Sequence, residues 1–142
     1  MKTFKFPFSI AYSDTDAGGI VYHGRYIEIA ERARMNMMRE IVLPSEDLGF
    51  VVRELSIKYM QPLHLADDII VETEIVNVGG ASMDLQQKFV HGDAVCAIMN
   101  ITVVYIGSDM RAKRIPGVVL ARLDSRKEDG HEELFVMDTF YK

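Results

Sequence analysis

The sequence predicts an α+β fold in which one antiparallel sheet curves around a single long helix. A period-2 apolar pattern opens the chain, a helical pattern follows over about residues 24–42, and strand patterns continue to about residue 107. Only this one long helix is available to cover a sheet of about five or six strands, and a curved sheet allows it to do so. The outer sheet face and the edges also need cover, so we expect a homodimer or homotetramer.

Apolar spacing predicts the first two elements. In the opening strand the alternating apolar positions are Phe4, Phe6, Phe8, Ile10 and Tyr12. In the helix the apolar positions recur in steps of three and four, at Tyr26, Ala30, Ala33, Met37 and Ile41. Leu43 and Pro44 end the helix, because proline disfavours helical backbone in the residue before it.

Residues that favour turns separate the later elements. We expect strands over 50–59, 68–78, 82–90 and 94–106, which alternate or are rich in Val, Ile and Thr. The breaks between and after them are Gln61-Pro62, Gly79-Gly80, His91-Gly92-Asp93 and Gly107-Ser108-Asp109. We expect these four strands to follow one another through hairpin-like turns. A short helical pattern over 118–123 comes next.

Length and composition favour one soluble domain. The chain has 142 residues, of which 49% are hydrophobic, and a net charge of −5 without a basic stripe, which argues against a nucleic-acid partner. The single cysteine, Cys96, excludes an intrachain disulfide and suits a reducing compartment. The first seven residues are too short and polar for a signal peptide, and no apolar run is long enough to span a membrane. We therefore expect a cytoplasmic protein with one domain over 1–123 and a C-terminal extension of unknown role over 124–142.

A pair of carboxylates directly before the predicted helix is the first candidate site. Asp14 and Asp16 precede Gly18 and Gly19, and the helix pattern begins a few residues later. The amides at a helix N-terminus lack intrahelical partners, and this end of the helix dipole is positive. A carboxylate beside such amides can activate water while the amides hold a developing oxyanion. Capping of the helix by these carboxylates is the structural alternative, and spacing alone leaves both open.

Two other loop types are excluded by the residues that follow. A calcium-binding EF-hand loop needs a glutamate where this chain has Arg25, and it has Gly18 at another ligand position. A phosphate-binding P-loop needs Lys followed by Ser or Thr where this chain has Arg25 and Tyr26. Neither reading therefore explains the Asp/Gly segment.

The other reactive side chains give weaker signals. His23, beside the predicted helix start, has no zinc-ligand partners at useful spacing, because His64, His91 and His131 look isolated. His23 can act as a general base through its ring, or it can contribute its backbone amide. Cys96 lies within a strand and reads as a core thiol, and the chain has no G-x-S-x-G elbow for a serine nucleophile.

A local cationic cluster follows the last predicted strand. It consists of Arg111, Lys113 and Arg114. A solvated loop explains such a cluster, and so does contact with the phosphates of a nucleotide-bearing substrate, to which arginine offers paired donors.

The segment from Tyr12 to His23, Y-S-D-T-D-A-G-G-I-V-Y-H, resembles the hot-dog-fold acyl-CoA thioesterases. The similarity is to the 4-hydroxybenzoyl-CoA thioesterase family and its tol-pal-associated branch. Further matching segments are Glu31-Arg32-Ala33-Arg34, Val51-Val52-Arg53, Tyr59-Met60-Gln61-Pro62, Asp67-Asp68-Ile69 and Arg114-Ile115-Pro116. The resemblance covers about residues 5–122 and agrees with the strand–helix–strands order.

The resemblance implies an acyl-CoA thioesterase that hydrolyses its substrate to free acid and CoA. Asp16 is then the catalytic carboxylate, as nucleophile or general base, and the backbone amides of about His23 and Gly24 polarise the thioester carbonyl. Family members bind coenzyme A across a subunit interface. The substrate-binding candidates are Tyr12, Tyr26, Arg111, Lys113 and Arg114. No separate cofactor or metal is implied, since CoA is part of the substrate, and an acyl-carrier protein is a second candidate partner.

Two alternatives stay open at this point. One is a hydratase or dehydratase on the same fold, which normally needs a histidine with an acidic partner, and no such second motif is found. The other is a non-catalytic module that binds acyl-CoA or an acyl carrier, against which the intact Asp16 beside Gly18 and Gly19 argues. The sequence leaves open the acyl group and the choice between dimer and tetramer.

Overall fold

The structure, a computed structural model, describes residues 3–42 and 44–126. Its elements are β1 (Thr3–Ser9), the 3-10 helix η1 (Tyr12–Asp14), α1 (Arg25–Ile41), β2 (Gly49–Tyr59), β3 (Asp68–Val78), β4 (Ser82–His91), β5 (Ala94–Ile106) and α2 (Gly117–Arg126). The long helix and the four later strands agree with their predicted limits to within one residue. Of the predicted extension over 124–142, the first three residues continue α2 and the rest lie outside the described residues.

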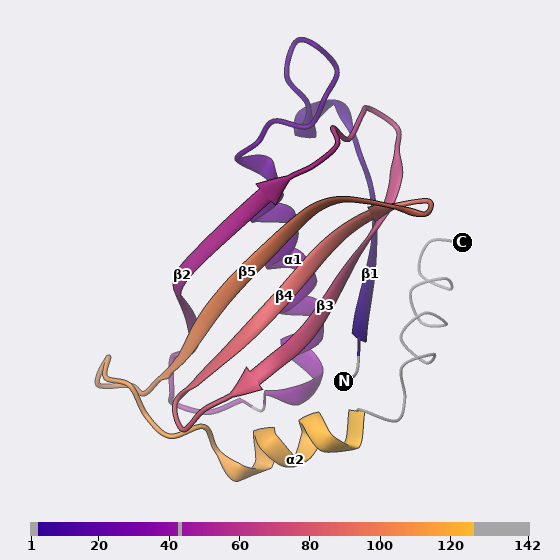
Figure 1. The fold of residues 1–142 in the computed structure, drawn as a ribbon. Coiled ribbons are helices and arrows are strands. Elements are labelled where there is room, and N and C mark those ends of the chain that lie inside the picture. Colours follow the sequence, from indigo (N-terminus) through magenta and orange to yellow (C-terminus); the bar gives the residue numbers. More distant parts are fainter. Residues whose placement is uncertain (1–2, 43, 127–142) are drawn as a thin grey trace.

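The sheet is five-stranded and antiparallel, in the order β1-β3-β4-β5-β2. It wraps across α1, and α2 lies at the end of the sheet opposite the loop that precedes α1 (Figure 1). The expectation that hairpin-like turns join the four later strands in succession was wrong for the first of the three connections. β2 pairs with β5 at one edge, whereas β3 pairs with β1 near the other edge.

The β2–β3 connection is anchored to the segments that flank the Asp/Gly loop. The amide of Ile10 donates to the carbonyl of Asp67 at 2.9 Å, and the amide of Val21 donates to the carbonyl of Leu63 at 2.8 Å. These bonds hold the β2–β3 connection as it crosses from the β2 edge of the sheet to the side of β1. β3 therefore begins beside β1 and is not a neighbour of β2.

The core lies between α1 and the concave face of the sheet. In β4, buried and partly exposed positions alternate, so Met83, Leu85 and Phe89 face the helix. Ile29, Ala33 and other α1 residues meet them, with exposed fractions of a few per cent. Burying a large apolar side chain of this kind contributes about 1.5–3 kcal/mol, so the α1–sheet contact holds the site-bearing end of α1 in place.

The opening strand ends earlier than predicted. Tyr12 was expected at its end, but β1 stops at Ser9 and Tyr12 begins η1. The side chain of Asp14 accepts a hydrogen bond from the Ala11 amide at 2.8 Å, so this amide is bonded locally instead of to a neighbouring strand. The chain therefore turns away from the sheet before the Asp/Gly loop.

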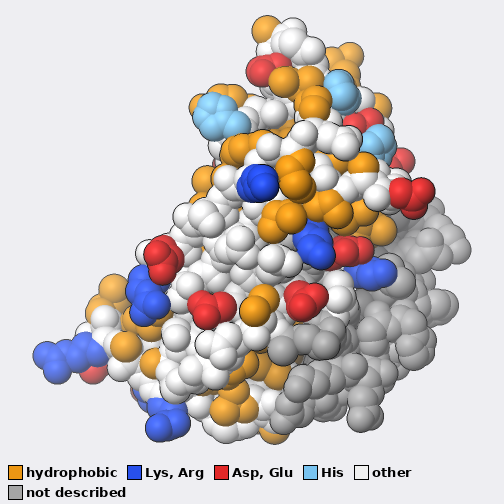
Figure 2. Space-filling model, viewed as in Figure 1, with side chains coloured by type: hydrophobic (Ala, Val, Ile, Leu, Met, Phe, Trp, Pro, Cys, Tyr) orange, Lys and Arg blue, Asp and Glu red, His pale blue; other side chains and the backbone are white. Residues whose placement is uncertain are grey.

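The outer face of the sheet is polar. Charged side chains of both signs are spread over it, while histidines and apolar side chains gather near the loops at the top of the view (Figure 2). At its β2 edge the sheet has no further strand among the described residues, and several apolar side chains on or beside this edge are exposed: Leu48, Val51, Val52, Tyr59 and Met60. The β1 edge also has no further strand among the described residues, so it is the exposed apolar side chains that distinguish the β2 edge.

Candidate active site

The Asp/Gly segment forms a small hairpin that leads into α1. Thr15 and Val21 pair as an isolated antiparallel bridge, and the Asp16 amide donates to the Ile20 carbonyl at 2.9 Å. The Gly19 amide closes the turn by donating to the Asp16 carbonyl at 3.1 Å. Gly19 has a φ of 81°, in the left-handed region that a side chain disfavours. The loop geometry therefore accounts for a glycine at this position.

Asp16 lies at the tip of this hairpin with an exposed side chain. Its Oδ1 accepts a hydrogen bond from the Gly18 amide at 2.8 Å, which orients the carboxylate on its own turn. Its other oxygen has no hydrogen-bond partner among the described residues. The carboxylate is thus oriented on one side and available on the other.

Asp14 has a different environment, because its side chain is only 2% exposed. One oxygen accepts from the Ala11 amide at 2.8 Å, and the other pairs with Nε of Arg25 at 2.7 Å. Its carbonyl accepts from the Tyr22 amide at 3.1 Å. Hydrogen bonds to Glu28 and to Asp14 raise the pKa of Arg25, in that order of size. Asp14 therefore joins the loop to the first turn of α1, in agreement with a structural role.

The start of α1 presents two unpaired amides. Gly24 is the N-cap, and the N–H groups of His23 and Gly24 make no hydrogen bond within the described part of the chain. The Tyr59 hydroxyl donates to the His23 carbonyl at 2.6 Å. The same peptide unit carries the Gly24 N–H on its opposite side, so Tyr59 fixes the direction of that donor. Such amides at a helix N-terminus are suited to an oxyanion.

Sequence reasoning missed this function of Tyr59. The residue stands in one of the matching segments, but its partner His23 is 36 positions away, and only the fold brings β2 to the start of α1. The His23 ring is exposed and contacts the Tyr22 ring at a centroid distance of 4.4 Å, with the two ring planes tilted by 41°. His23 thus contributes a ring and an amide at the same end of the helix.

The two tyrosines expected to bind substrate lie in contrasting places. Tyr12 is 82% exposed on η1, whereas Tyr26 is 3% exposed. The Tyr26 ring packs edge-on against the rings of Tyr59 and Phe89, at centroid distances of 5.0 Å and 5.1 Å. Burial raises the pKa of the Tyr26 hydroxyl. The ring of Tyr26 therefore supports Tyr59 from within the core.

His64 and His91, which looked isolated in the sequence, share one carboxylate. His64 Nδ1 and His91 Nε2 each lie 3.7 Å from an oxygen of Asp67. The expectation of isolated side chains was therefore wrong for these two, because the β2–β3 connection folds back over the end of β4. Across residues 3–42 and 44–126, no group of three His, Cys, Asp or Glu residues is placed to hold a metal ion.

The cationic cluster lies at the other end of the sheet within one chain. The cluster, Arg111, Lys113 and Arg114, follows the end of β5 at which Ile106 pairs with Gly49. At the opposite end of β5, Ala97 pairs with Tyr59, which bonds His23. Nine residues of strand separate these ends, about 30 Å. Lys113 pairs with Asp47 at 3.0 Å. One chain does not bring this cluster to Asp16.

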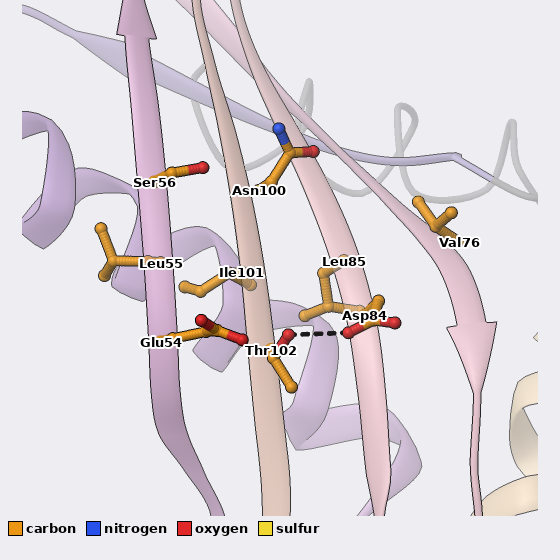
Figure 3. A pocket seen from close by; sticks show the side chains of 9 residues that line it. All are labelled: Glu54, Leu55, Ser56, Val76, Asp84, Leu85, Asn100, Ile101 and Thr102. Carbon is orange, nitrogen blue, oxygen red and sulfur yellow. Dashed lines mark hydrogen bonds between the residues drawn. The ribbon is translucent and has the colours of Figure 1, made fainter.

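Two hollows on the described surface bear on the site. One, of about 610 Å³, is a mostly apolar groove between α1 and β2, lined by residues that include Met35, Met38 and Phe50. The other, of about 290 Å³, lies on the outer face of the sheet and has a mixed polar and apolar lining (Figure 3). There the Thr102 hydroxyl donates to Asp84 at 2.7 Å. Of these two hollows, the groove is the one that adjoins the helix that carries the candidate amides.

Cys96 is a core thiol and does not join the site. It is 2% exposed, and burial raises its pKa. A buried thiol with a raised pKa is a poor nucleophile at neutral pH.

The chain is similar in sequence to known thioesterases. The Acyl-CoA thioester hydrolase YbgC of Escherichia coli O6:H1 is 38% identical over 95 residues, which are 63% of this chain and 71% of that protein. The Acyl-CoA thioesterase YbgC of Haemophilus influenzae is 36% identical over 109 residues, which are 72% of this chain and 80% of that protein.

Solved structures share the architecture. A probable thioesterase from Bartonella henselae is 28% identical with a TM-score of 0.74, over 82% of this chain and 100% of that chain. A 4-hydroxybenzoyl CoA thioesterase complexed with 4-hydroxybenzoyl CoA has a TM-score of 0.77 at 15% identity, over 86% of this chain and 99% of that chain, which shows a common fold. The predicted hot-dog fold is confirmed. Because the family model of the Thioesterase-like superfamily also matches residues 10–123, the chain belongs to this superfamily.

Proposed function

We propose that this protein hydrolyses acyl-CoA thioesters, with Asp16 as the reacting carboxylate and the amides of His23 and Gly24 as the oxyanion site. The observation that carries this proposal is an exposed, oriented carboxylate on the hairpin that leads directly into unpaired helix N-terminal amides. Membership of the thioesterase-like superfamily and the thioesterase names of the relatives support the reaction.

The reaction needs little machinery beyond these groups. The thioester carbonyl accepts hydrogen bonds from the helix amides, and negative charge develops on its oxygen as a nucleophile adds. The free oxygen of Asp16 either adds to the carbonyl carbon, giving a mixed anhydride that water then cleaves, or takes a proton from an attacking water. In both routes the C–S bond breaks and CoA leaves as thiolate, a leaving group that needs less acid assistance than an alkoxide.

We also propose that the active unit is a homodimer joined through β2. The unpaired edge of β2 and the exposed apolar residues on and beside it support this assembly. A two-fold axis across this edge pairs the two β2 strands in antiparallel fashion, which sets the Gly49 end of one subunit beside the Tyr59 end of the other. The partner's cationic cluster then approaches the Asp16 site, where it can meet the CoA phosphates.

A substrate panel tests the proposed reaction. Purified protein is incubated with short, long and aromatic acyl-CoAs and with an acylated acyl-carrier protein, and released thiol is measured. We expect thiol release from at least one CoA thioester, and the carrier arm separates the two sources of the thioester bond. Tight acyl-CoA binding without thiol release across the panel would point to the binding module instead, and an absorbance change with enoyl-CoA but no free thiol would point to a hydratase.

A further inference from the structure

The groove between α1 and β2 has the size and lining of a small-molecule site. Its volume of about 610 Å³ falls in the range of ligand pockets, and most of its walls are apolar. Met35 and Met38 supply the helix side, and Val51 and Val52 supply part of the strand side. Met35 is 58% exposed and Val52 is 43% exposed, so one chain leaves these apolar walls open, and the partner subunit of the proposed β2-joined dimer would close them.

One lining side chain, Arg34, is buried and charged. It is only 7% exposed, and its one hydrogen bond to a described residue runs from Nη1 to Oε1 of Gln87, at 3.1 Å. The described residues place no carboxylate within 4.0 Å of it. A guanidinium has five N–H donors and stays protonated at neutral pH. Because Arg34 makes only one hydrogen bond to a described residue, most of its donors have no described partner.

Gln87 cannot neutralise this charge. Gln87 is fully buried, and its Nε2 donates to the Ala30 carbonyl and to the Thr73 hydroxyl, both at 3.0 Å. These two bonds fix the direction of its Oε1 and so hold Arg34 in one orientation. Burial lowers the pKa of Arg34, and the nearby carboxylate of Glu31, which makes no ion pair with it within 4.0 Å, raises that pKa by less. A buried charge without a counter-charge in contact is costly, and the geometry of a carboxylate matches a guanidinium. The arrangement is therefore built to receive an anion.

Arg34 lies on the same α1–β2 seam as the oxyanion amides. Ten residues separate it from Gly24, which is about 15 Å along a helix, and helical side chains lean back toward the N-terminus. On the opposite wall, β2 runs from Val51 and Val52 beside the groove to Tyr59 beside His23. An acyl chain whose carbonyl sits at the helix start can follow this seam to Arg34 if it is long enough.

We infer that the acyl group follows this seam to the groove and that Arg34, on the side of the groove nearest the helix start, binds a carboxylate at the end of the acyl chain, so that long ω-carboxyacyl thioesters are the preferred substrates. This inference rests on the proposed thioesterase function and names the substrate class of the same site. Glu31 also lines the groove, one turn from Arg34, and its exposed carboxylate opposes a second negative charge there. The selectivity is thus a balance between Arg34 and Glu31.

Matched substrates test this inference. Octanoyl-CoA and suberoyl-CoA have the same chain length and differ by the terminal carboxylate, while succinyl-CoA carries a carboxylate on a chain too short to reach Arg34. The measured quantity is the ratio of kcat/KM for suberoyl-CoA to that for octanoyl-CoA. We expect the wild-type ratio to exceed one and to fall by about tenfold or more in Arg34→Met, because the site would then leave the carboxylate unpaired. Arg34→Lys should recover part of the ratio, and Glu31→Gln should raise it.

Arg32→Met is the control, because Arg32 is exposed on the same helix. It should leave the ratio unchanged, and melting temperatures report whether each variant is folded.

An equal loss on both substrates in Arg34→Met would make Arg34 structural and overturn the inference, as would a wild-type preference for octanoyl-CoA. A fall in assembly mass by light scattering in Arg34→Met, with the ratio unchanged, would assign the charge to contact with a second copy. If no acyl-CoA released thiol, the proposed function itself would fail; release without an Arg34-dependent ratio would contradict this inference alone.

Discussion

The two aspartates of the hairpin stand two residues apart and have opposite surroundings. Asp14 is buried and holds Arg25 and the Ala11 amide, while Asp16 is exposed and held only by the Gly18 amide. The sequence could indicate a loop carboxylate beside a helix start, and the resemblance indicated which one reacts. The sequence could not show the contact between Asp14 and Arg25, because this contact depends on how η1 turns the chain.

Tyr59 is expected to act as a positioning residue. In Tyr59→Phe the His23 carbonyl loses its 2.6 Å donor, so the Gly24 amide is no longer held toward the oxyanion. We expect kcat to fall by about tenfold to a hundredfold with little change in KM. Tyr105→Phe is the matched control, since the Tyr105 hydroxyl bonds Asp47 at the other end of the sheet. Equal effects of both substitutions would contradict the assignment.

The ion pair between Asp47 and Lys113 predicts a pH effect on stability. The hydrogen bond from Lys113, and then that from Tyr105, lowers the pKa of Asp47 below its ordinary value of 3.8. A carboxyl whose pKa is lower in the folded state stabilises the fold above its ordinary pKa, and this stabilisation is lost as pH falls through the folded value. The free energy of unfolding of wild type minus that of Asp47→Asn should therefore be constant near neutral pH and shrink in acid below 3.8.

Denaturant unfolding at low salt, measured from neutral pH down into acid, checks this. Added salt should reduce the difference, because the Lys113 end of the pair is exposed. A difference that grows as the pH falls would show that the sign is wrong.

At the scale of elements, the hairpin and α1 form one unit that sets the site. The Asp/Gly string and the helix limits were readable from the sequence, since turn residues and apolar spacing are local signals. The exact hairpin was not, because its Thr15–Val21 bridge is stabilised by the β2–β3 connection, through the bond from Val21 to Leu63.

Gly19 provides the test at this scale. Gly19→Ala meets no nearby atom, but the φ of 81° is unfavourable for a side chain, so we expect a loss of about 1–2 kcal/mol in the free energy of unfolding. Activity should fall with it, because Asp16 is on the same turn. Gly80→Ala, also in open space but without a left-handed φ, is the control for denaturant unfolding. Equal free energies of unfolding for Gly19→Ala and Gly80→Ala would contradict this prediction, because the left-handed φ of Gly19 would then not constrain the hairpin.

At the scale of the whole molecule, the sheet order determines what lies next to the site. Local patterns gave the strands, but the placement of β2 beside β5 depends on contacts between distant residues, and period-2 patterns carry no information on neighbours. The same limit hid Arg34, which reads as one more charged helix position until the fold buries it against Gln87. No helix among the described residues is both long and apolar enough to cross a membrane.

Mixed dimers test the proposed assembly. One subunit carries Asp16→Asn and the other carries Arg111→Ala with Arg114→Ala. If the partner supplies the cationic cluster, one of the two sites is complete and we expect about half the wild-type kcat/KM from the purified mixed dimer. If each chain used its own cluster, both sites would be defective and the mixed dimer would be no better than its parents.

The most direct test of the central claim is the turnover of Asp16→Asn on the best acyl-CoA of the panel. This substitution keeps the Gly18 hydrogen bond possible and removes the reacting oxygen, so we expect kcat to fall by about 10²–10⁴-fold with an unchanged melting temperature and retained substrate binding. Asp93→Asn, in the exposed β4–β5 turn, should be fully active. Wild-type turnover in Asp16→Asn would contradict the account.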